Sequence, residues 1–130
     1  MATILLVEDD DDAAEVVAHA LRKSGHRVMS VPNGRDALAL LLLGTIDLVV
    51  TDLRMPEMDG VTLLTVMRSY LRFKSTPVIV FSAYAEGRTG QSVRDLGVAE
   101  VFRKGSANLD EIVAAVGRHL NPPAPNTSRN

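Results

Sequence analysis

Hydrophobic and polar positions along the chain fall into two alternating patterns. Short runs rich in β-branched residues recur five times, and three of them are apolar throughout their centres. Continuous apolar runs are typical of strands covered on both faces, as in a parallel sheet. The predicted strands are residues 4–7, 28–31, 47–51, 78–81 and 99–102.

Between these runs, apolar residues recur at the three- and four-residue spacing of an amphipathic helix. The predicted helices are residues 12–24, 34–43, 60–71 and 108–120. The residues expected on their buried faces are Val16, Val17, Ala20, Leu21, Ala37, Leu38, Leu41, Leu42, Leu63, Leu64, Met67, Leu71, Leu109, Ile112, Val113, Val116 and Leu120. We also expect Leu40 and Leu43 in the core, with an exposed contact surface as the alternative.

Capping residues support these boundaries. Asn33 and Asn108 are favourable N-caps, and Asn108 is followed three residues later by Glu111, which is a capping-box pattern. Gly25 and Gly44 follow the first two helices, where a left-handed closing residue is favoured.

The region between the last two strands carries a weaker helical signal. Residues 86–90 contain two glycines, and each disfavours a helix interior by about 1 kcal/mol relative to alanine. We therefore expect this helix to begin near Gln91 and to end at Leu96, before Gly97.

Strands that alternate with helices predict an α/β fold with a parallel sheet and right-handed crossovers. Ligands of such sheets bind beyond the carboxyl ends of the strands. Acidic residues 8–12 follow the first strand, Asp52 follows the third, Ser82 follows the fourth, and Lys104 follows the fifth. The sequence therefore predicts carboxylates, a hydroxyl and an ammonium at one edge of the sheet.

Carboxylates gathered at one edge repel one another. At about 4 Å and an effective dielectric near 20, each pair costs roughly 4 kcal/mol, so cations are needed there. Lys104 supplies one charge, and oxygen ligands without His or Cys favour Mg²⁺ as the second. An Asp beside Mg²⁺, a hydroxyl and a Lys is an arrangement for phosphoryl transfer to the carboxylate. For Asp11 and Asp12, in contrast, a solvated first helical turn is the better reading.

Composition narrows the function classes. The 130 residues carry a net charge of −2 and no cysteine, which argues against a nucleic-acid-coating protein and excludes thiol chemistry. No apolar run has the roughly 18 residues that span a bilayer, and the N-terminus lacks a secretory signal pattern. We expect one cytoplasmic domain over residues 1–120, with residues 121–130 as a disordered tail or linker stub.

Four segments together carry a family resemblance. They are Ile4-Leu5-Leu6-Val7-Glu8-Asp9, Asp47-Leu48-Val49-Val50-Thr51-Asp52-Leu53-Arg54-Met55-Pro56-Glu57-Met58-Asp59-Gly60, Pro77-Val78-Ile79-Val80-Phe81-Ser82-Ala83, and Lys104. In this order and spacing they resemble the receiver domain of two-component response regulators, from residue 3 to about residue 120. The resemblance implies a flavodoxin-like, doubly wound sheet of five parallel strands in the order 2-1-3-4-5, with helices on both faces.

The resemblance also implies residue roles. Asp52 resembles the phosphoacceptor, which takes a phosphoryl group from a histidine kinase or a phosphotransfer protein. Glu8 and Asp9 resemble the acidic pair that holds Mg²⁺ with Asp52 and the backbone carbonyl of Arg54. Asp10 is expected at most to act on the ligands of the ion, without binding the ion itself.

Ser82 resembles the switch hydroxyl of the family, and Lys104 the lysine that pairs with the phosphate. The protein is thus expected to be a phosphorylation-dependent switch that catalyses only its own phosphorylation and dephosphorylation. It would signal through protein contacts to an unidentified target, without binding nucleic acid or membrane directly. No output domain follows residue 120, so the chain reads as a stand-alone receiver or as part of a larger protein.

Three positions depart from the family pattern. The family usually has an aromatic residue three positions before the lysine, where this chain has Val101. Phe102 lies one residue further on and therefore on the other face of the strand, so either Phe102 is simply a core residue or the aromatic switch is absent, and we favour its absence. Gly105 follows Lys104 in place of the usual proline, which predicts a looser turn. Glycines weaken the fourth helix, so we expect the phosphorylation signal to pass through order and disorder of residues 84–96.

Two bulky residues lie where the family sets the lifetime of the phosphoryl group. Arg54 stands two positions after Asp52, and Tyr84 two positions after Ser82. We expect them to restrict access for the hydrolytic water.

Other functions fit the residues less well. A phosphatase with an aspartyl nucleophile would carry a second Asp where Arg54 stands. An FMN-binding protein of the same fold would need a hydroxyl-rich loop where the acids of residues 8–12 lie. A receiver that only mediates contacts would not need the intact acidic set. His19, His26 and His119 are expected to be structural or exposed.

Overall fold

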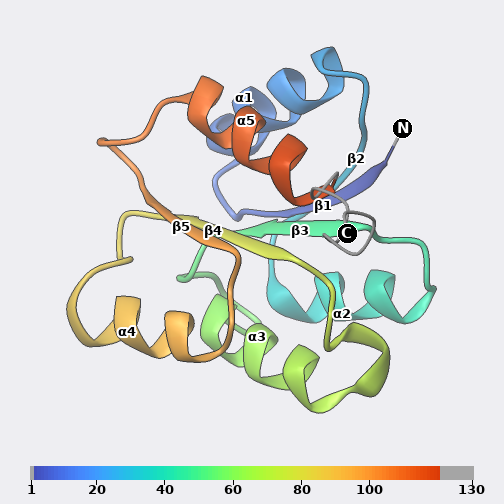
Figure 1. The fold of residues 1–130 in the computed structure, drawn as a ribbon, viewed down its shortest axis with the longest axis vertical. Helices are drawn as coiled ribbons and strands as arrows, with labels where there is room; N and C mark the ends of the chain where they lie inside the picture. The colour runs from blue at the N-terminus through green and yellow to red at the C-terminus, as the bar shows by residue number, and fades with distance from the viewer. Residues whose placement is uncertain (1, 121–130) are drawn as a thin grey trace, which may run out of the picture.

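The computed structural model describes residues 2–120, which form one five-stranded parallel sheet with helices on both faces (Figure 1). The strand order is β2-β1-β3-β4-β5, as predicted. The strands are β1 (Thr3–Val7), β2 (Arg27–Val31), β3 (Leu48–Thr51), β4 (Val78–Ser82) and β5 (Glu100–Arg103). The helices are α1 (Asp11–Lys23), α2 (Gly34–Leu42), α3 (Gly60–Ser69), the short 3-10 helix η1 (Leu71–Phe73), α4 (Gly87–Asp95) and α5 (Leu109–Leu120).

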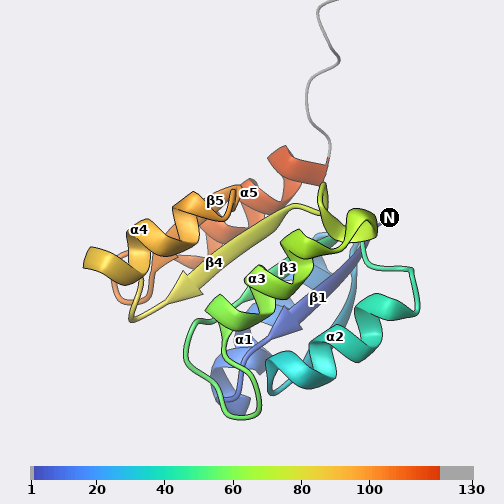
Figure 2. The ribbon, with the colours of Figure 1, turned by 90° about the horizontal axis from the view of Figure 1, so that it is seen from below.

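The sheet separates two hydrophobic cores because successive residues of a strand point to opposite faces. In β1, Leu5 and Val7 pack into the core beneath α2, α3 and α4, while Ile4 and Leu6 pack into the core beneath α1 and α5. Figures 1 and 2 show these two helical layers. The three central strands are almost fully buried, which explains their unbroken apolar runs.

The predicted helix caps are confirmed. The Asn33 side chain accepts a hydrogen bond from the Asp36 N–H at 2.7 Å. Asn108 and Glu111 each accept a bond from the other's backbone N–H, at 2.9 and 3.0 Å. Gly25 and Gly44 have φ angles of +95° and +88°, the left-handed conformation expected after a helix.

The predicted start of the fourth helix is wrong, whereas its end is close. The helix begins at Gly87 rather than near Gln91, and Leu96 is its C-cap. Both glycines have a structural use: Gly87 has a φ of +60°, and a Cβ on Gly90 would lie 2.7 Å from the Ala85 carbonyl oxygen. The low intrinsic helix propensity of glycine is therefore outweighed by this close packing.

Several residues predicted on buried helix faces are exposed. Val16 is 51% exposed, Leu42 is 44% exposed and Leu71 is 87% exposed. The buried stripe of α1 runs instead through Ala14, Val17, Ala18 and Leu21, while α3 ends at Ser69 and so excludes Leu71 from its face. Leu43 is also exposed, at 73%, which contradicts its expected place in the core.

Two further expectations from the sequence concern the C-terminal residues and membrane-spanning helices. The disordered tail predicted for residues 121–130 lies outside the described residues. Within residues 2–120, no helix has the length and apolar character needed to cross a membrane.

Candidate phosphoryl-acceptor and metal site

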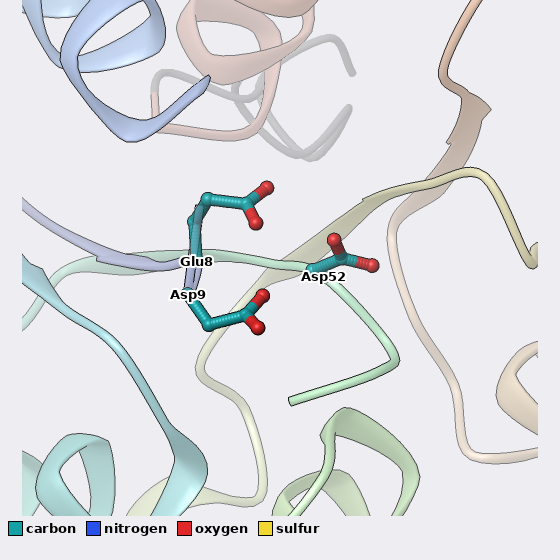
Figure 3. Close-up of side chains that lie close together, drawn as sticks. All are labelled: Glu8, Asp9 and Asp52. Atoms are coloured by element: carbon teal, nitrogen blue, oxygen red, sulfur yellow. The ribbon is translucent and has the colours of Figure 1, made fainter. Parts of the chain in front are cut away.

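The sheet brings the predicted acidic residues together at the carboxyl ends of its central strands. Glu8 and Asp9 follow β1, and Asp52 follows β3, which is the neighbour of β1 in the sheet. One carboxylate oxygen from each of the three residues lies within 4.8 Å of the others. Figure 3 shows the Glu8 and Asp9 side chains extending on the side of β1 that faces Asp52. Glu8 and Asp52 are buried, whereas Asp9 is exposed.

Lys104 lies between two of these carboxylates. Its Nζ donates to Asp52 Oδ2 at 2.8 Å and also to Glu8 Oε1. The residue is placed by a turn after β5, in which the Lys104 N–H donates to the Ser82 carbonyl oxygen at 3.1 Å. One cation therefore offsets part of the repulsion between two buried anions.

These contacts shift the pKa values of Asp52 and Lys104 in opposite directions. Burial alone would raise the pKa of Asp52, but hydrogen bonds from Lys104, the Ser82 hydroxyl and the Leu53 N–H outweigh it and lower the pKa from 3.8. For Lys104, burial is likewise outweighed by the bonds to Asp52 and Glu8, so its pKa is raised. Asp52 is therefore ionised and Lys104 protonated at neutral pH.

Glu8 differs from Asp52 although the two share Lys104. Burial raises the pKa of Glu8, and the hydrogen bond from Lys104 does not offset this. The negative charge of Asp52 raises it further. One lysine is thus insufficient for both carboxylates, and the site has room for more positive charge.

The donor set fits a hard divalent cation. Glu8, Asp9 and Asp52 offer only oxygen atoms, and the exposed Asp9 leaves one side open to water. Mg²⁺ binds few protein carboxylates and keeps several waters, so this half-open group of acids suits it. The residues present are therefore compatible with the Mg²⁺ expected from the sequence.

Backbone donors that the sequence could not reveal orient the acids. The Leu53 N–H donates to Asp52 Oδ1 at 2.6 Å, and the Asp10 N–H donates to Glu8 Oε2 at 3.1 Å. The Asp10 side chain caps α1 by accepting from the Ala13 N–H at 3.0 Å. Any residue type can provide an N–H, so no side-chain signal marks Leu53 or Asp10 in these roles.

Ser82 is fully buried at the end of β4. Its hydroxyl oxygen accepts a hydrogen bond from the Tyr84 N–H at 3.1 Å, and the hydroxyl also helps to lower the pKa of Asp52. The serine therefore connects the acidic site to the segment that leads into α4.

Arg54 and Tyr84 line a hollow that also includes Leu53, the residue that follows Asp52. The Arg54 guanidinium carbon lies 4.2 Å from the centroid of the Tyr84 ring, which is a cation–π contact. The hollow has a volume of about 430 Å³ and also includes Ala83 and Thr89 in its lining. The sequence placed both bulky residues near the site but did not predict that they contact each other.

The structure confirms that Val101 and Phe102 lie on opposite faces of β5. Val101 packs into the core beneath α2, α3 and α4, and Phe102 packs into the core on the opposite face. The turn after Lys104 is closed by Ser106 and Ala107, whose N–H groups both donate to the Arg103 carbonyl oxygen. Hydrogen bonds therefore hold this turn without a proline.

Comparisons with known proteins agree with this fold. The family model described as the response regulator receiver domain matches residues 4–117. The chain is 38% identical over 117 residues to the regulatory protein AtoC of Escherichia coli, covering 90% of this chain and 25% of AtoC. It is 43% identical over 90 residues to the sensor kinase CckA of Brucella abortus, covering 65% of this chain and 9% of CckA. The chain thus spans a quarter or less of these two relatives.

Solved structures of receiver domains have the same fold as this chain. The non-phosphorylated HemR receiver domain of Leptospira biflexa aligns with a TM-score of 0.85 at 29% identity, covering 96% of this chain and 98% of that one. The receiver domain of a histidine kinase from Syntrophus aciditrophicus aligns with a TM-score of 0.84 at 30% identity, covering 92% and 90%. The chain belongs to the receiver domain family of two-component response regulators.

Proposed function

We propose that Asp52 accepts a phosphoryl group from a phosphohistidine of a histidine kinase or phosphotransfer protein, in a Mg²⁺-dependent reaction. The observation that carries this proposal is the convergence of Glu8, Asp9 and Asp52 within 4.8 Å, with Lys104 bound to two of them. Glu8, Asp9, Asp52 and the backbone carbonyl of Arg54 would hold the ion. Bound Mg²⁺ would supply positive charge to the phosphoryl oxygens and to the acidic group.

The chemical step uses the ionised state of Asp52. One of its carboxylate oxygens attacks the phosphorus atom, the bond from phosphorus to the donor imidazole nitrogen breaks, and an aspartyl phosphate forms. The released imidazole nitrogen takes up a proton from solvent. Because the pKa of Asp52 is lowered, its carboxylate needs no base to prepare it.

Lys104 is suited to stabilise the product. Its Nζ already contacts Asp52 Oδ2, so a small movement would pair it with an oxygen of the new phosphoryl group. Ser82 would turn its hydroxyl toward another phosphoryl oxygen. We propose these two residues as catalytic and switching groups of the site.

The output of the switch would pass through the N-terminal end of α4. That end is held by the bond from the Tyr84 N–H to Ser82 and by an exposed ion pair between Glu86 and Arg103. The C-terminal end is held more firmly, because Arg68 donates to the carbonyl oxygens of Leu96 and Gly97. If Ser82 turns to the phosphoryl group, residues 84–96 lose a contact at the less restrained end.

This route needs no aromatic residue at position 101. Val101 offers no ring that could move with Ser82, so the backbone of residues 83–86 is the shortest connection to α4. The domain would comprise residues 1–120 and act in the cytoplasm as a switch whose only catalysis is its own phosphorylation and dephosphorylation. Its target would be a protein.

Intact mass spectrometry after incubation with acetyl phosphate and Mg²⁺ tests the proposal. Wild type should gain the mass of one phosphoryl group, and Asp52→Asn should gain none. Asp47→Asn is a matched control, because Asp47 is an exposed acid that accepts from the Thr3 N–H at 2.8 Å, away from the site. Equal labelling of wild type and Asp52→Asn, or labelling that persists when Mg²⁺ is chelated, would refute the proposal.

A further inference from the structure

The segment between Asp52 and α3 contains two consecutive strained residues. Glu57 and Met58 have φ angles of +53° and +89°, and neither is glycine. Such conformations are strained in residues other than glycine and persist only where the surroundings enforce them. Contacts around this segment must therefore hold it in place.

The first turn of α2 provides those contacts. The Gly34 N–H donates to the Met58 carbonyl oxygen at 2.9 Å, and the Arg35 N–H donates to the Glu57 carbonyl oxygen at 3.1 Å. N–H groups in the first turn of a helix have no partner inside the helix, so they are free to bind another segment. Asn33 caps the next N–H, that of Asp36, with its own side chain.

Only glycine fits at position 34. A Cβ there would lie 2.5 Å from the Met58 carbonyl oxygen and 3.0 Å from Met58 Cγ. The backbone of α2 therefore approaches the strained segment as closely as a side-chain-free residue allows. Figure 2 shows the loop before α3 beside the start of α2.

The other end of the segment is fixed as closely. The Gly60 N–H donates to the Leu53 carbonyl oxygen at 3.0 Å, and a Cβ on Gly60 would lie 2.2 Å from the Asp52 carbonyl oxygen. Asp59 caps α3 by accepting from the Thr62 N–H at 2.9 Å. Arg54 lies between these fixed points, so the path of its backbone depends on both.

We infer that the first turn of α2 positions the metal-binding segment, with Gly34 and Arg35 as positioning residues for the carbonyl of Arg54. This inference rests on the proposed function, in which that carbonyl holds Mg²⁺. The two N–H groups offset the strain at Glu57 and Met58 and so keep the carbonyl ready for the ion. Coupling between two sites is reciprocal, so Mg²⁺ binding must in turn strengthen the contacts of the α2 turn.

Two variants weaken these contacts in different ways. Gly34→Ala introduces the clash with Met58, and Arg35→Pro removes one N–H of the first helical turn, where N–H groups have no partner inside the helix. Gly117→Ala is the control for the first, because a Cβ on Gly117 meets nothing within 4 Å. Arg35→Ala is the control for the second, because it removes the exposed side-chain pair with Glu57 but keeps the N–H.

Isothermal titration with Mg²⁺ gives the readout, and thermal unfolding without Mg²⁺ shows that each variant is folded. We expect Gly34→Ala and Arg35→Pro to bind Mg²⁺ at least about tenfold more weakly than wild type, with both controls within about twofold; tenfold corresponds to about 1.4 kcal/mol. Folded variants that bind Mg²⁺ as wild type does would overturn the inference.

Amide hydrogen exchange on the wild-type protein tests the same coupling without any substitution. Saturating Mg²⁺ should slow exchange at the Gly34 and Arg35 amides, while amides of α5 stay unchanged. Unchanged exchange at Gly34 and Arg35, in a protein that binds Mg²⁺, would reject the positioning role. A wild-type protein that binds no Mg²⁺ would instead reject the proposed function, so the two failures are distinguishable.

Discussion

The Tyr84 N–H donates a hydrogen bond of 3.1 Å to the hydroxyl oxygen of Ser82, and the same hydroxyl helps to lower the pKa of Asp52. One buried serine thus contacts both the acidic site and the segment that leads into α4. Any rotation of Ser82 toward a phosphoryl group must weaken the bond to Tyr84.

Hydrogen exchange should therefore report phosphorylation in residues 84–96. With beryllofluoride and Mg²⁺ as a phosphoryl mimic, we expect faster exchange at the N-terminal turn of α4 than in the unliganded protein. The C-terminal turn should change less, because Arg68 binds the Leu96 carbonyl oxygen at 2.8 Å. Unchanged protection throughout residues 84–96 would rule out this route, and Ser82→Ala should abolish the response.

Lys104→Met should separate metal binding from phosphoryl transfer. Removal of the ammonium deprives Asp52 and Glu8 of their shared cation, so the pKa of Asp52 should rise from its lowered value. The more negative site should bind Mg²⁺ about tenfold more tightly, a Coulomb gain reduced by solvent screening. Phosphorylation should nevertheless slow. Carboxyl NMR titration measures the pKa of Asp52, and calorimetry measures the affinity for Mg²⁺. Weaker Mg²⁺ binding by the variant than by wild type would contradict this prediction.

Two carboxylates of the site should show opposite pH dependence in the metal-free protein. The pKa of Asp52 is lowered from 3.8, so its contribution to the free energy of unfolding is present above that pH and is lost as the pH falls through the folded-state value. The pKa of Glu8 is raised from 4.5, so the protein should lose stability as the pH rises from 4.5 through the raised value.

Urea unfolding over a pH series checks this pair of signs. Relative to Asp52→Asn, wild type should lose free energy of unfolding as the pH falls. Against Glu8→Gln, wild type should instead lose relative stability as the medium becomes less acidic. Slopes of the same sign for both variants would show that the charges are not balanced as described.

Arg54→Ala/Tyr84→Ala should shorten the lifetime of the aspartyl phosphate severalfold. The Arg54 guanidinium carbon lies 4.2 Å from the centroid of the Tyr84 ring, in the loops that follow β3 and β4, and we expect this pair to restrict the approach of water to the phosphoryl group. Tyr70→Ala/Arg72→Ala is a matched control, because both side chains are exposed and lie at η1 instead, Tyr70 as its N-cap and Arg72 within it. Loss of the phosphoryl group is followed by intact mass, and equal or slower hydrolysis in the first variant would show that the pair does not protect it.

Much of this structure was predictable from the sequence, because strand burial and helix capping leave local signals. The order of the strands and the meeting of Glu8, Asp9 and Asp52 followed from the family pattern. The start of α4 did not, because the close approach of Gly90 to Ala85 is a tertiary contact that propensity ignores.

Some side-chain contacts and exposures could not be predicted from the sequence either. Val16 is exposed because the buried face of α1 is turned by part of a helical turn from the face that the sequence predicts. Hydrophobic periodicity does not determine the rotation of a helix about its axis to that precision. The contact between Arg54 and Tyr84 joins two loops that follow different strands. The contacts that hold Met58 in its strained conformation likewise come from α2, which is distant in the chain.

Borohydride reduction of the phosphorylated protein, followed by peptide sequencing in a mass spectrometer, tests the central claim most directly. Reduction of an aspartyl phosphate converts that aspartate to homoserine and so identifies the residue that carried the phosphoryl group. The account predicts homoserine at position 52 alone, and only when Mg²⁺ was present. Homoserine at Asp9, at Asp10 or at any other acid, with Asp52 intact, would contradict it.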